Sequence, residues 1–429
     1  MTSPSSPAEP LPGGGCPAHA ATGAVRLSGP EFQTEPQALY RTMRRTHGSV
    51  VPVELPGGFP AWLVVGYREL LQVTGDGELF PRDVGLWNQW EHIPEDWPLL
   101  PMVGRPMPSI YFTAGAEHRR HSRMVVPALE EADPFEIRRH CERLADRLVD
   151  SVCTVGTADL VADFAEPLPV LVLARLVGFP DAEGADIARV LKDLADGGPG
   201  AQEAYGRFAG HMARLVAAKR AEPGDDVTSR MLAYPEAFTD EEYALDLMAV
   251  TAAGHLTTAD WISNSLRLML TEDQFAASLA GGRRSVADAM NEVLWEESPT
   301  QVLAGRWAAR DTRLGGRSIS AGDMLLLGLG AANTDPLIRE QLTPYGGSGQ
   351  GGNSAHLAFS HGEYRCPFPA QEIAETIART GIEVLLDRLP DLDLAVPAES
   401  LVRRPSAFLR GMNALPVRFT PVQTTGDML

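Results

Sequence analysis

One long helical pattern, which runs from Thr239 to Leu270, constrains the fold of this chain more than any other feature. Thr239 is suited to cap its start, and Glu242 stands at the third position of a capping box. Asp240 and Glu241 make the first turn acidic, which the positive end of a helix dipole favours. The sequence therefore predicts a single uninterrupted helix across this stretch.

The rest of the pattern is mostly helical as well. Apolar residues at three- and four-residue spacing recur between Glu117 and Arg284. Strand patterns are shorter: VVPVEL and PAWLVVGY alternate on either side of a Pro-Gly-Gly turn. We therefore predict a mainly α fold with small β-sheets, built as one large domain over residues 25–429. Further helices are expected over Ser285–Glu297 and Pro369–Leu386, and short strands over Arg310–Leu329.

Two segments have a composition that argues against regular structure. Residues 1–24 are rich in Pro, Gly, Ser and Ala and hold few groups able to anchor a core, which is typical of a disordered tail. Residues 84–112 contain three tryptophans and many prolines, which predicts a long irregular loop. Loops of that length inside a compact enzyme often face the substrate.

The charge balance excludes several classes of function. With 37 Lys+Arg against 56 Asp+Glu, the formal net charge is −19, whereas a general nucleic-acid binder needs a basic surface. No apolar run approaches the ~18–20 residues of a membrane span, and the N-terminus lacks the pattern of a signal peptide. The four cysteines show no paired or metal-finger spacing. We expect a cytoplasmic protein with reduced thiols and with neither nucleic-acid nor membrane partners.

A loop that ends in a cysteine precedes the last long predicted helix. Cys366 lies near the N-terminus of that helix, where the helix dipole favours a thiolate able to bind a metal. Phe359 could shield such a thiolate, and Gly362 would let the backbone turn beneath a flat ligand. Taken alone, Cys366 is better explained as a buried structural thiol.

The motif around this cysteine, Phe-x-x-Gly-x-x-x-Cys, resembles the haem-binding loop of the cytochrome P450 family. Other landmarks of that family recur in the same order over most of the chain. Ala253–Thr258 is similar to the oxygen-binding stretch of the family's long central helix, and Glu292–Trp295 stands where a Glu-x-x-Arg helix belongs. The chain most resembles an actinobacterial subgroup that lacks this arginine. Further matches are Glu117-His118, Arg306 with the strand region after it, and Ala331–Pro336.

The resemblance implies haem b as the cofactor, with Cys366 as the axial thiolate and metal ligand. Thiolate ligation favours cleavage of the O–O bond. It also implies that Arg306 and His118 bind the haem propionates and that the Tyr364 hydroxyl can serve in the same way. The residues alone leave other interpretations open, in which Arg306 is a surface arginine of a strand and His118 caps the start of a helix.

The same resemblance assigns the oxygen site to the long helix. Thr257 would hydrogen bond oxygen and its water, with Thr258 beside it, because a hydroxyl both donates and accepts. Ala253 and Gly254 would leave room for oxygen beside the helix. Alternatively, both threonines donate to helix carbonyls, as threonines inside helices often do.

Three positions depart from the family pattern. Leu256 stands where an acid usually precedes the threonine, which removes a proton donor that His255 or Asp260 would have to replace through water. Trp295 replaces the arginine of the Glu-x-x-Arg motif, and we predict that its side chain fills the vacated volume. Phe368 stands two residues after the cysteine, where glycine is common, so its ring must point away from the haem or pack against its underside.

The predicted substrate pocket is apolar and aromatic, with scattered amides such as Asn88 and Gln301. Such a lining suits a mid-sized, partly aromatic natural product. Trp87 and Trp90 are equally well explained as aromatic residues that pack a loop. The residues that we expect in the pocket are Trp87, Gln89, Val302, Leu303 and Phe408.

A basic cluster stands out in this acidic chain and consists of Arg119, Arg120, His121 and Arg123. The resemblance places it on the thiolate side of the haem, where an acidic ferredoxin would dock through complementary charge. An ordinary solvated helix face explains the cluster equally well.

The implied function is a haem-thiolate monooxygenase of secondary metabolism that activates O2 to hydroxylate or oxidatively couple a small organic substrate. Electrons would come from NAD(P)H through a ferredoxin reductase and a ferredoxin, and we expect a monomer. A second class is a haem-binding protein of the same fold with a sensing or partner-binding role and little oxygenase activity. A third is peroxide-driven chemistry that bypasses the ferredoxin.

Overall fold

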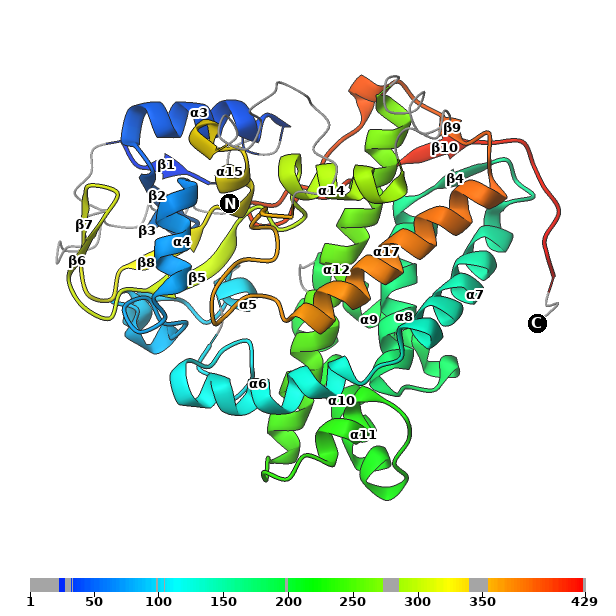
Figure 1. The fold of residues 1–429 in the computed structure, drawn as a ribbon, viewed down its shortest axis with the longest axis horizontal. Helices are drawn as coiled ribbons and strands as arrows, with labels where there is room; N and C mark the ends of the chain where they lie inside the picture. Colours follow the sequence, from blue (N-terminus) through cyan, green and yellow to red (C-terminus); the bar gives the residue numbers. More distant parts are fainter. Residues whose placement is uncertain are drawn as a thin grey trace, which may run out of the picture.

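The computed structural model describes residues 23–27, 32, 34–97, 99–103, 105–196, 200–272, 285–338 and 354–426. Within it, a helix-rich part lies beside a part that holds the largest sheet (Figure 1). The predicted tail 1–24 falls outside the described residues except for Gly23 and Ala24. None of the described helices combines the length and the apolar character needed to cross a membrane.

The long predicted helix is confirmed as α12, which spans Asp240–Thr271 in 32 residues. Its start carries the predicted capping box: the Thr239 Oγ1 accepts from the Glu242 N at 3.2 Å, and the Glu242 Oε2 accepts from the Thr239 N at 2.6 Å. The helix runs through the middle of the molecule (Figure 1). It packs against α8 (Pro167–Val177), α10 (Ala201–Ala221), α14 (Val286–Glu296) and α17 (Phe368–Arg388).

The other helices of this part wrap around α12 and share one apolar core with it. The free cysteines Cys141 and Cys153 are both buried in that core, which agrees with reduced structural thiols. These elements are α6 (Gly115–Glu130), α7 (Pro134–Val152), a π-helical turn (Val161–Ala165), α9 (Asp181–Asp196) and α11 (Val227–Leu232).

The largest sheet has five strands in the order β1-β2-β3-β8-β5. The predicted strand pair is confirmed, because β2 (Val50–Leu55) runs antiparallel to β3 (Phe59–Val64). β3 pairs in parallel with β8 (Met324–Leu327), and β5 (Leu303–Trp307) runs antiparallel to β8 at the edge. The remaining strands are β1 (Val25–Arg26), the sheet β4-β10-β9 (Thr157–Asp159, Pro416–Arg418, Asp393–Leu394) and the hairpin β6-β7 (Thr312–Leu314, Arg317–Ile319).

The segment predicted as a long loop, 84–112, lies beside this sheet and contains short helical turns. Trp87 and Trp97 are both buried in it, and their rings lie 6.3 Å and 5.5 Å from the ring of Phe59 on β3. The mainly α fold with small sheets is therefore confirmed, with this aromatic cluster joining loop and sheet. The short helices of this part are α3 (Pro36–His47), α4 (Tyr67–Gly75), α5 (Leu100–Val103), α15 (Leu329–Asn333), and the 3-10 turns Val84–Leu86 and Trp90–His92. A further 3-10 turn, Ala398–Ser400, follows β9.

Candidate functional site

The cysteine loop closes on itself just before α17. The Cys366 N donates to the Phe359 O at 3.0 Å, and the Gln371 side chain of α17 donates to the Cys366 O at 2.6 Å. Gly362 has φ +76°, and a Cβ there would lie 1.9 Å from the Thr74 O at the end of α4. The glycine that the sequence singled out is therefore required both for the turn and for the close approach of two backbones.

Cys366 as a residue is partly exposed and lies two positions before α17 begins. Burial in apolar surroundings raises the pKa of the Cys366 thiol to about 12, so the helix dipole alone does not make a thiolate here. A metal ion bound at the sulfur would supply the positive charge that a thiolate needs.

Two buried arginines lie near this loop without a carboxylate partner in the described part of the chain. Arg306 on β5 is fully buried, its guanidinium lies 4.7 Å from the ring centre of Tyr364, and its Nε and Nη2 have no hydrogen-bond partner. Arg82 is 8 % exposed, stacks on the Tyr111 ring at 3.8 Å and leaves its Nη2 unpaired. Burial and the charge of Arg82 lower the pKa of Arg306 to about 9. Such a pair of cations requires an anionic ligand.

The other two predicted propionate ligands lie in the same place. The His118 Nδ1 and Nε2 lie 3.0 Å and 3.3 Å from the carbonyl oxygens of Ile110 and Glu363, and its ring lies 4.7 Å from that of Tyr364. The Tyr364 hydroxyl accepts from the Gly115 N at 3.2 Å. The structure thus brings Arg306, His118 and Tyr364 together, and the polar atoms of His118 and Tyr364 hold the cysteine loop to α6.

Arg82 was missed by the sequence reasoning. It follows Pro81 in a loop and belongs to no motif. It lies close enough to lower the pKa of Arg306, because the Trp307 N donates to the Pro81 O at 3.1 Å and ties the loop to β5. No local signal in the sequence indicates that contact.

The middle of α12 has one face that other side chains leave uncovered. Ala252 and Ala253 are exposed and Leu256 and Thr257 are partly exposed, although most neighbours along the helix are buried. The Thr257 hydroxyl donates to the Ala253 O at 2.6 Å. This back-bond is the alternative geometry that the sequence left open, and the hydroxyl remains at the uncovered face.

Two residues next to that face, Thr258 and Gly254, are packed against other parts of the protein. Thr258 is buried, at 2 % exposure, and a Cβ on Gly254 would lie 3.0 Å from the Leu173 side chain of α8. Gly254 therefore allows α12 and α8 to pack closely. The Phe359 ring lies 5.8 Å from that of Trp261 on α12, which places the cysteine loop one helical turn from Thr257.

Trp295 is buried on α14, at 2 % exposure. Its ring meets that of His356 edge-on at 5.9 Å, and His356 in turn lies 6.0 Å from Phe359 of the cysteine loop. Asn333 joins the same two segments, because its Nδ2 donates to the Leu294 O at 2.9 Å and its Oδ1 accepts from the Leu357 N at 2.7 Å. Aromatic packing thus connects the Glu-x-x-Trp helix to the cysteine loop.

The predicted pocket residues fall into separate groups. Trp87, Val302 and Phe408 share one apolar cluster, and the Trp87 Nε1 is buried without a hydrogen-bond partner. Leu303 packs against a different cluster. The Gln89 amide donates to the Asn88 side chain at 3.0 Å in an exposed turn. The structure therefore groups three of the five predicted residues.

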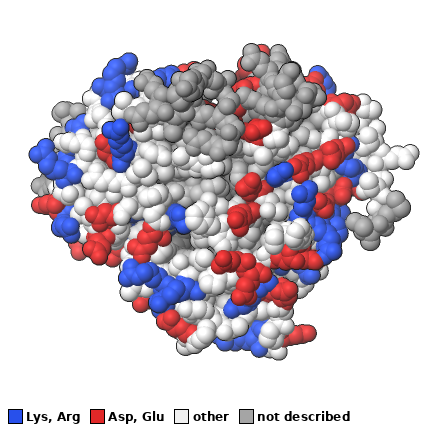
Figure 2. All heavy atoms as spheres, in the orientation of Figure 1, with Lys and Arg blue, Asp and Glu red and all other residues white. Residues whose placement is uncertain are grey.

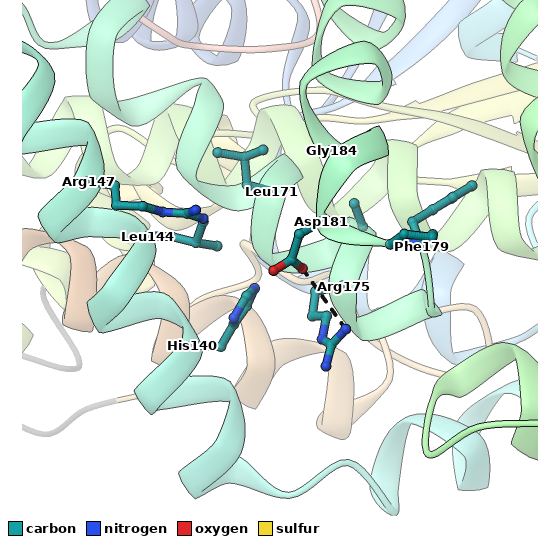
Figure 3. Close-up of a pocket in the computed structure, with 10 residues that line it drawn as sticks. His140, Leu144, Arg147, Leu171, Arg175, Phe179, Asp181 and Gly184 are labelled. Atoms are coloured by element: carbon teal, nitrogen blue, oxygen red, sulfur yellow. Dashed lines mark ion pairs between the residues drawn. The ribbon is translucent and has the colours of Figure 1, made fainter. Parts of the chain in front are cut away.

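A separate small pocket lies between α7, α8 and α9 (Figure 3). Arg175 and Asp181 form an ion pair at 4.0 Å on its rim, and burial together with Arg143 lowers the pKa of His140 to about 4. It is lined by none of the residues that the sequence assigned to the haem or to the substrate, and we assign it no part in the site.

The described residues fit haem b. Cys366 offers sulfur for the iron, the unpaired guanidiniums of Arg82 and Arg306 match anionic propionates, and the uncovered face of α12 leaves space beside the cysteine loop. This donor set is unexplained without such a group, because two buried cations would otherwise lack a counter-charge.

Known proteins resemble this chain over most of its length, although no family model matches it. Cytochrome P450 105C1 from Streptomyces sp. is 31 % identical over 366 residues, 84 % of this chain and 89 % of that protein. The 2-hydroxy-5-methyl-1-naphthoate 7-hydroxylase of Streptomyces carzinostaticus is 27 % identical over 87 % of this chain and 92 % of its own. The testosterone-bound structure of CYP154C4 from Streptomyces sp. ATCC 11861 superposes with a TM-score of 0.82 at 27 % identity, over 93 % of this chain and 99 % of that one. The chain therefore belongs to the cytochrome P450 family and is a haem-thiolate monooxygenase.

Proposed function

We propose that this enzyme hydroxylates a mid-sized, largely apolar natural product that has an aromatic part and at least one hydrogen-bond acceptor. The observation that carries the proposal is the cluster of Trp87, Val302 and Phe408 around a buried, unpaired Trp87 Nε1. The Trp307 Nε1 in the same cluster is also buried without a partner, and an apolar lining with unsatisfied donors favours a ligand that brings an acceptor oxygen to it.

We assign the residues around the haem site different roles in binding the haem and in proton transfer. Haem bound through a thiolate supplies the activation of O2. Cys366 would hold the iron, and Arg82 and Arg306 would orient the propionates together with His118 and Tyr364. The Thr257 hydroxyl would turn from the Ala253 O and hold a proton at its Oγ1 toward the uncovered face of α12.

Hydroxylation is favoured over oxidative coupling by the relatives. One of them is named for hydroxylating a naphthoate, and the solved neighbour has testosterone bound. Both molecules combine a rigid apolar ring system with oxygen acceptors, which is the kind of ligand that we propose for the Trp87 cluster. That this enzyme acts as a cytoplasmic monomer over residues 25–429 stays a prediction from the sequence.

A substrate panel tests the proposal. Testosterone and 2-hydroxy-5-methyl-1-naphthoate are titrated into the haem-loaded enzyme, and the Soret shift gives their Kd. Turnover with NADPH, ferredoxin reductase and ferredoxin under 18O2 is then compared with turnover on peroxide alone. We expect at least one ligand to bind and to gain one 18O atom. Product formation on peroxide together with none through ferredoxin would contradict the ferredoxin route, and binding of neither ligand would contradict the assigned substrate class.

The predicted basic cluster is largely neutralised within the protein. Arg120 bonds to Glu242 at 2.6 Å and to Glu236 at 3.0 Å, and Arg119 bonds to Glu363 at 2.9 Å. His121 is fully buried against Asp246, so it cannot contribute to a docking surface. On the face shown in Figure 2, basic and acidic side chains are interspersed. Charge alone is therefore a weak basis for ferredoxin docking here.

Phe368 offers a better anchor for the electron donor. It is 56 % exposed beside the cysteine loop, and the Arg365 guanidinium covers its ring at 3.7 Å. Its ring thus faces solvent, which supports the expected orientation away from the haem. We propose that an acidic ferredoxin docks on this aromatic and cationic spot, since exposed aromatic residues and arginines dominate binding energy at interfaces.

Replacing Phe368 with alanine is expected to raise the KM for ferredoxin about tenfold, because the partner loses its apolar anchor. Steady-state rates at varied ferredoxin measure the change. Phe135→Ala is the matched control, because Phe135 is 81 % exposed on α7 and should leave that KM unchanged. An equal effect of both variants, or no effect of Phe368→Ala, would contradict the docking site.

A further inference from the structure

Asp260 is a buried carboxylate to which the proposed function gives no task. It lies on α12, is 1 % exposed, and neither of its carboxylate oxygens has a hydrogen-bond partner in the described part of the protein. Its ion pair with Arg404 is 3.3 Å long. Buried carboxylates normally accept several hydrogen bonds, so this exception calls for an explanation.

A hairpin over residues 402–413 rests directly on this carboxylate. The Arg404 N donates to the Gly411 O at 3.0 Å, and the Asn413 N donates to the Val402 O at 2.9 Å. A Cβ on Gly411 would lie 1.9 Å from the Asp260 Oδ1, so only glycine lets the base of the hairpin come this close. Asp260 therefore touches the base of the hairpin at two points, the Gly411 backbone and the Arg404 side chain.

The tip of the same hairpin carries Phe408. The Phe408 O accepts from the Gln301 N at 2.9 Å and from the Val302 N at 3.1 Å. These bonds hold the Phe408 ring in the cluster that contains Trp87. One hydrogen-bonded hairpin thus connects the Asp260 carboxylate to a wall of the proposed substrate pocket.

A second ion pair, between Arg403 and Glu297, also holds the hairpin, and both of its members stay charged near neutral pH. Arg403 donates to the Asn264 Oδ1 and to Glu297, both at 2.6 Å. Burial alone would raise the pKa of Glu297. The positive charges of Arg403, Arg267 and Arg410 outweigh that effect and lower this pKa to about 2. Glu297 therefore stays ionised and anchors the hairpin without responding to pH near neutrality.

We propose that Asp260 is a positioning residue, which acts through Arg404 to hold hairpin 402–413 and thereby sets the place of Phe408 in the substrate pocket. This inference rests on the proposed function, since it assumes that Phe408 lines that pocket.

The contact is expected to respond to pH. Burial raises the pKa of Asp260 to about 7, with Glu166 adding to the rise and Arg404 and Arg403 opposing it. Above that pH the ionised carboxylate attracts Arg404, which also bonds to Glu166 at 3.0 Å. Below it Asp260 is neutral, and Arg404 is held by Glu166 alone. Other charged and titratable groups contact these partners. Lys192 pairs with Glu166, and Glu297 pairs with Arg403. The Nε2 of the buried His255 lies 3.0 Å from the backbone oxygen of Glu166.

Asp260→Asn tests the proposal, because it imitates the neutral form at every pH. 4-Phenylimidazole and imidazole serve as probes, since both ligate haem iron and only the larger one reaches the pocket wall. The Kd ratio of variant to wild type for 4-phenylimidazole is expected to be near 1 at pH 6 and about fivefold at pH 8.5. The ratio for imidazole should stay near 1. In the same samples, hydrogen exchange of the Arg404 and Asn413 backbone amides should be faster in the variant than in the wild type, and at pH 8.5 only.

Three further variants make the outcome decisive. Asp246→Asn removes another buried carboxylate of α12, which pairs with His121, and should change neither readout. Arg404→Gln breaks the same contact from the hairpin side and serves if Asp260→Asn does not fold. Phe408→Ala tests the pocket itself.

Two outcomes would contradict parts of the account. If Phe408→Ala alters 4-phenylimidazole binding while Asp260→Asn and Arg404→Gln change neither probe binding nor amide exchange, the positioning role of Asp260 is wrong and the pocket assignment is retained. If Phe408→Ala has no effect, the pocket assignment is wrong, and faster amide exchange alone would then reduce Asp260 to a structural anchor.

Discussion

Gly362→Ala is expected to abolish haem incorporation. The new Cβ would lie 1.9 Å from the Thr74 carbonyl oxygen, and φ of +76° is strained for any side chain. Neither backbone can give way cheaply, because the Cys366 N is bonded to the Phe359 O on the far side of the turn. We expect a loss of at least about 3 kcal/mol in the free energy of unfolding. The ratio of Soret to protein absorbance, together with urea unfolding, measures both effects.

Gly316→Ala is the matched control for that variant. Gly316 has nearly the same φ, +79°, but nothing lies within 4 Å of a Cβ there. It should cost only about 1–2 kcal/mol from the backbone conformation and leave haem content unchanged. Equal haem content in the two variants would show that the approach of the cysteine loop to α4 is not required.

The second large effect is expected for Trp295→Arg. The variant removes a buried indole that packs on His356 and puts a guanidinium in its place. Loss of packing by a large buried side chain costs about 3–5 kcal/mol, and desolvation of the new guanidinium adds to it, even with Glu292 one turn before it on α14. Haem content and the thermal unfolding temperature should both fall, whereas Trp295→Phe keeps an aromatic contact and should lose less. A gain of either quantity in Trp295→Arg would contradict the volume-filling role of the tryptophan.

The elements that could be predicted from the sequence are those with local signals. Thr239 and Glu242 mark the start of α12, and the alternation around a Pro-Gly-Gly turn marks the β2-β3 pair, because capping and pairing involve residues close in the chain. The cysteine loop was found for the same reason: its residues lie within one short motif, and the structure closes that motif into one turn.

The rest depends on contacts that no local pattern records. Arg82 lies near Arg306 because the loop that contains Pro81 bonds to β5. His121 is buried because α6 packs on α12, where His121 pairs with Asp246. Gln301 is expected from the sequence as one of the scattered amides in the pocket lining. In the structure its Nε2 donates to the Ser406 O at 3.1 Å and its Oε1 accepts from the Tyr40 hydroxyl at 3.4 Å, so it joins the hairpin to α3. Side chains that satisfy distant backbone groups look the same in sequence as side chains that bind ligands.

The central claim is that Cys366 supplies the thiolate ligand of a haem held by Arg82 and Arg306. The ferrous-CO difference spectrum of the haem-loaded enzyme, compared with that of Cys366→Ser, tests it most directly. We predict a strongly red-shifted Soret band in the wild type that is lost in the variant. A folded, haem-loaded wild type without this band, or a variant that keeps it, would contradict the assignment of Cys366 and with it the oxygenase chemistry.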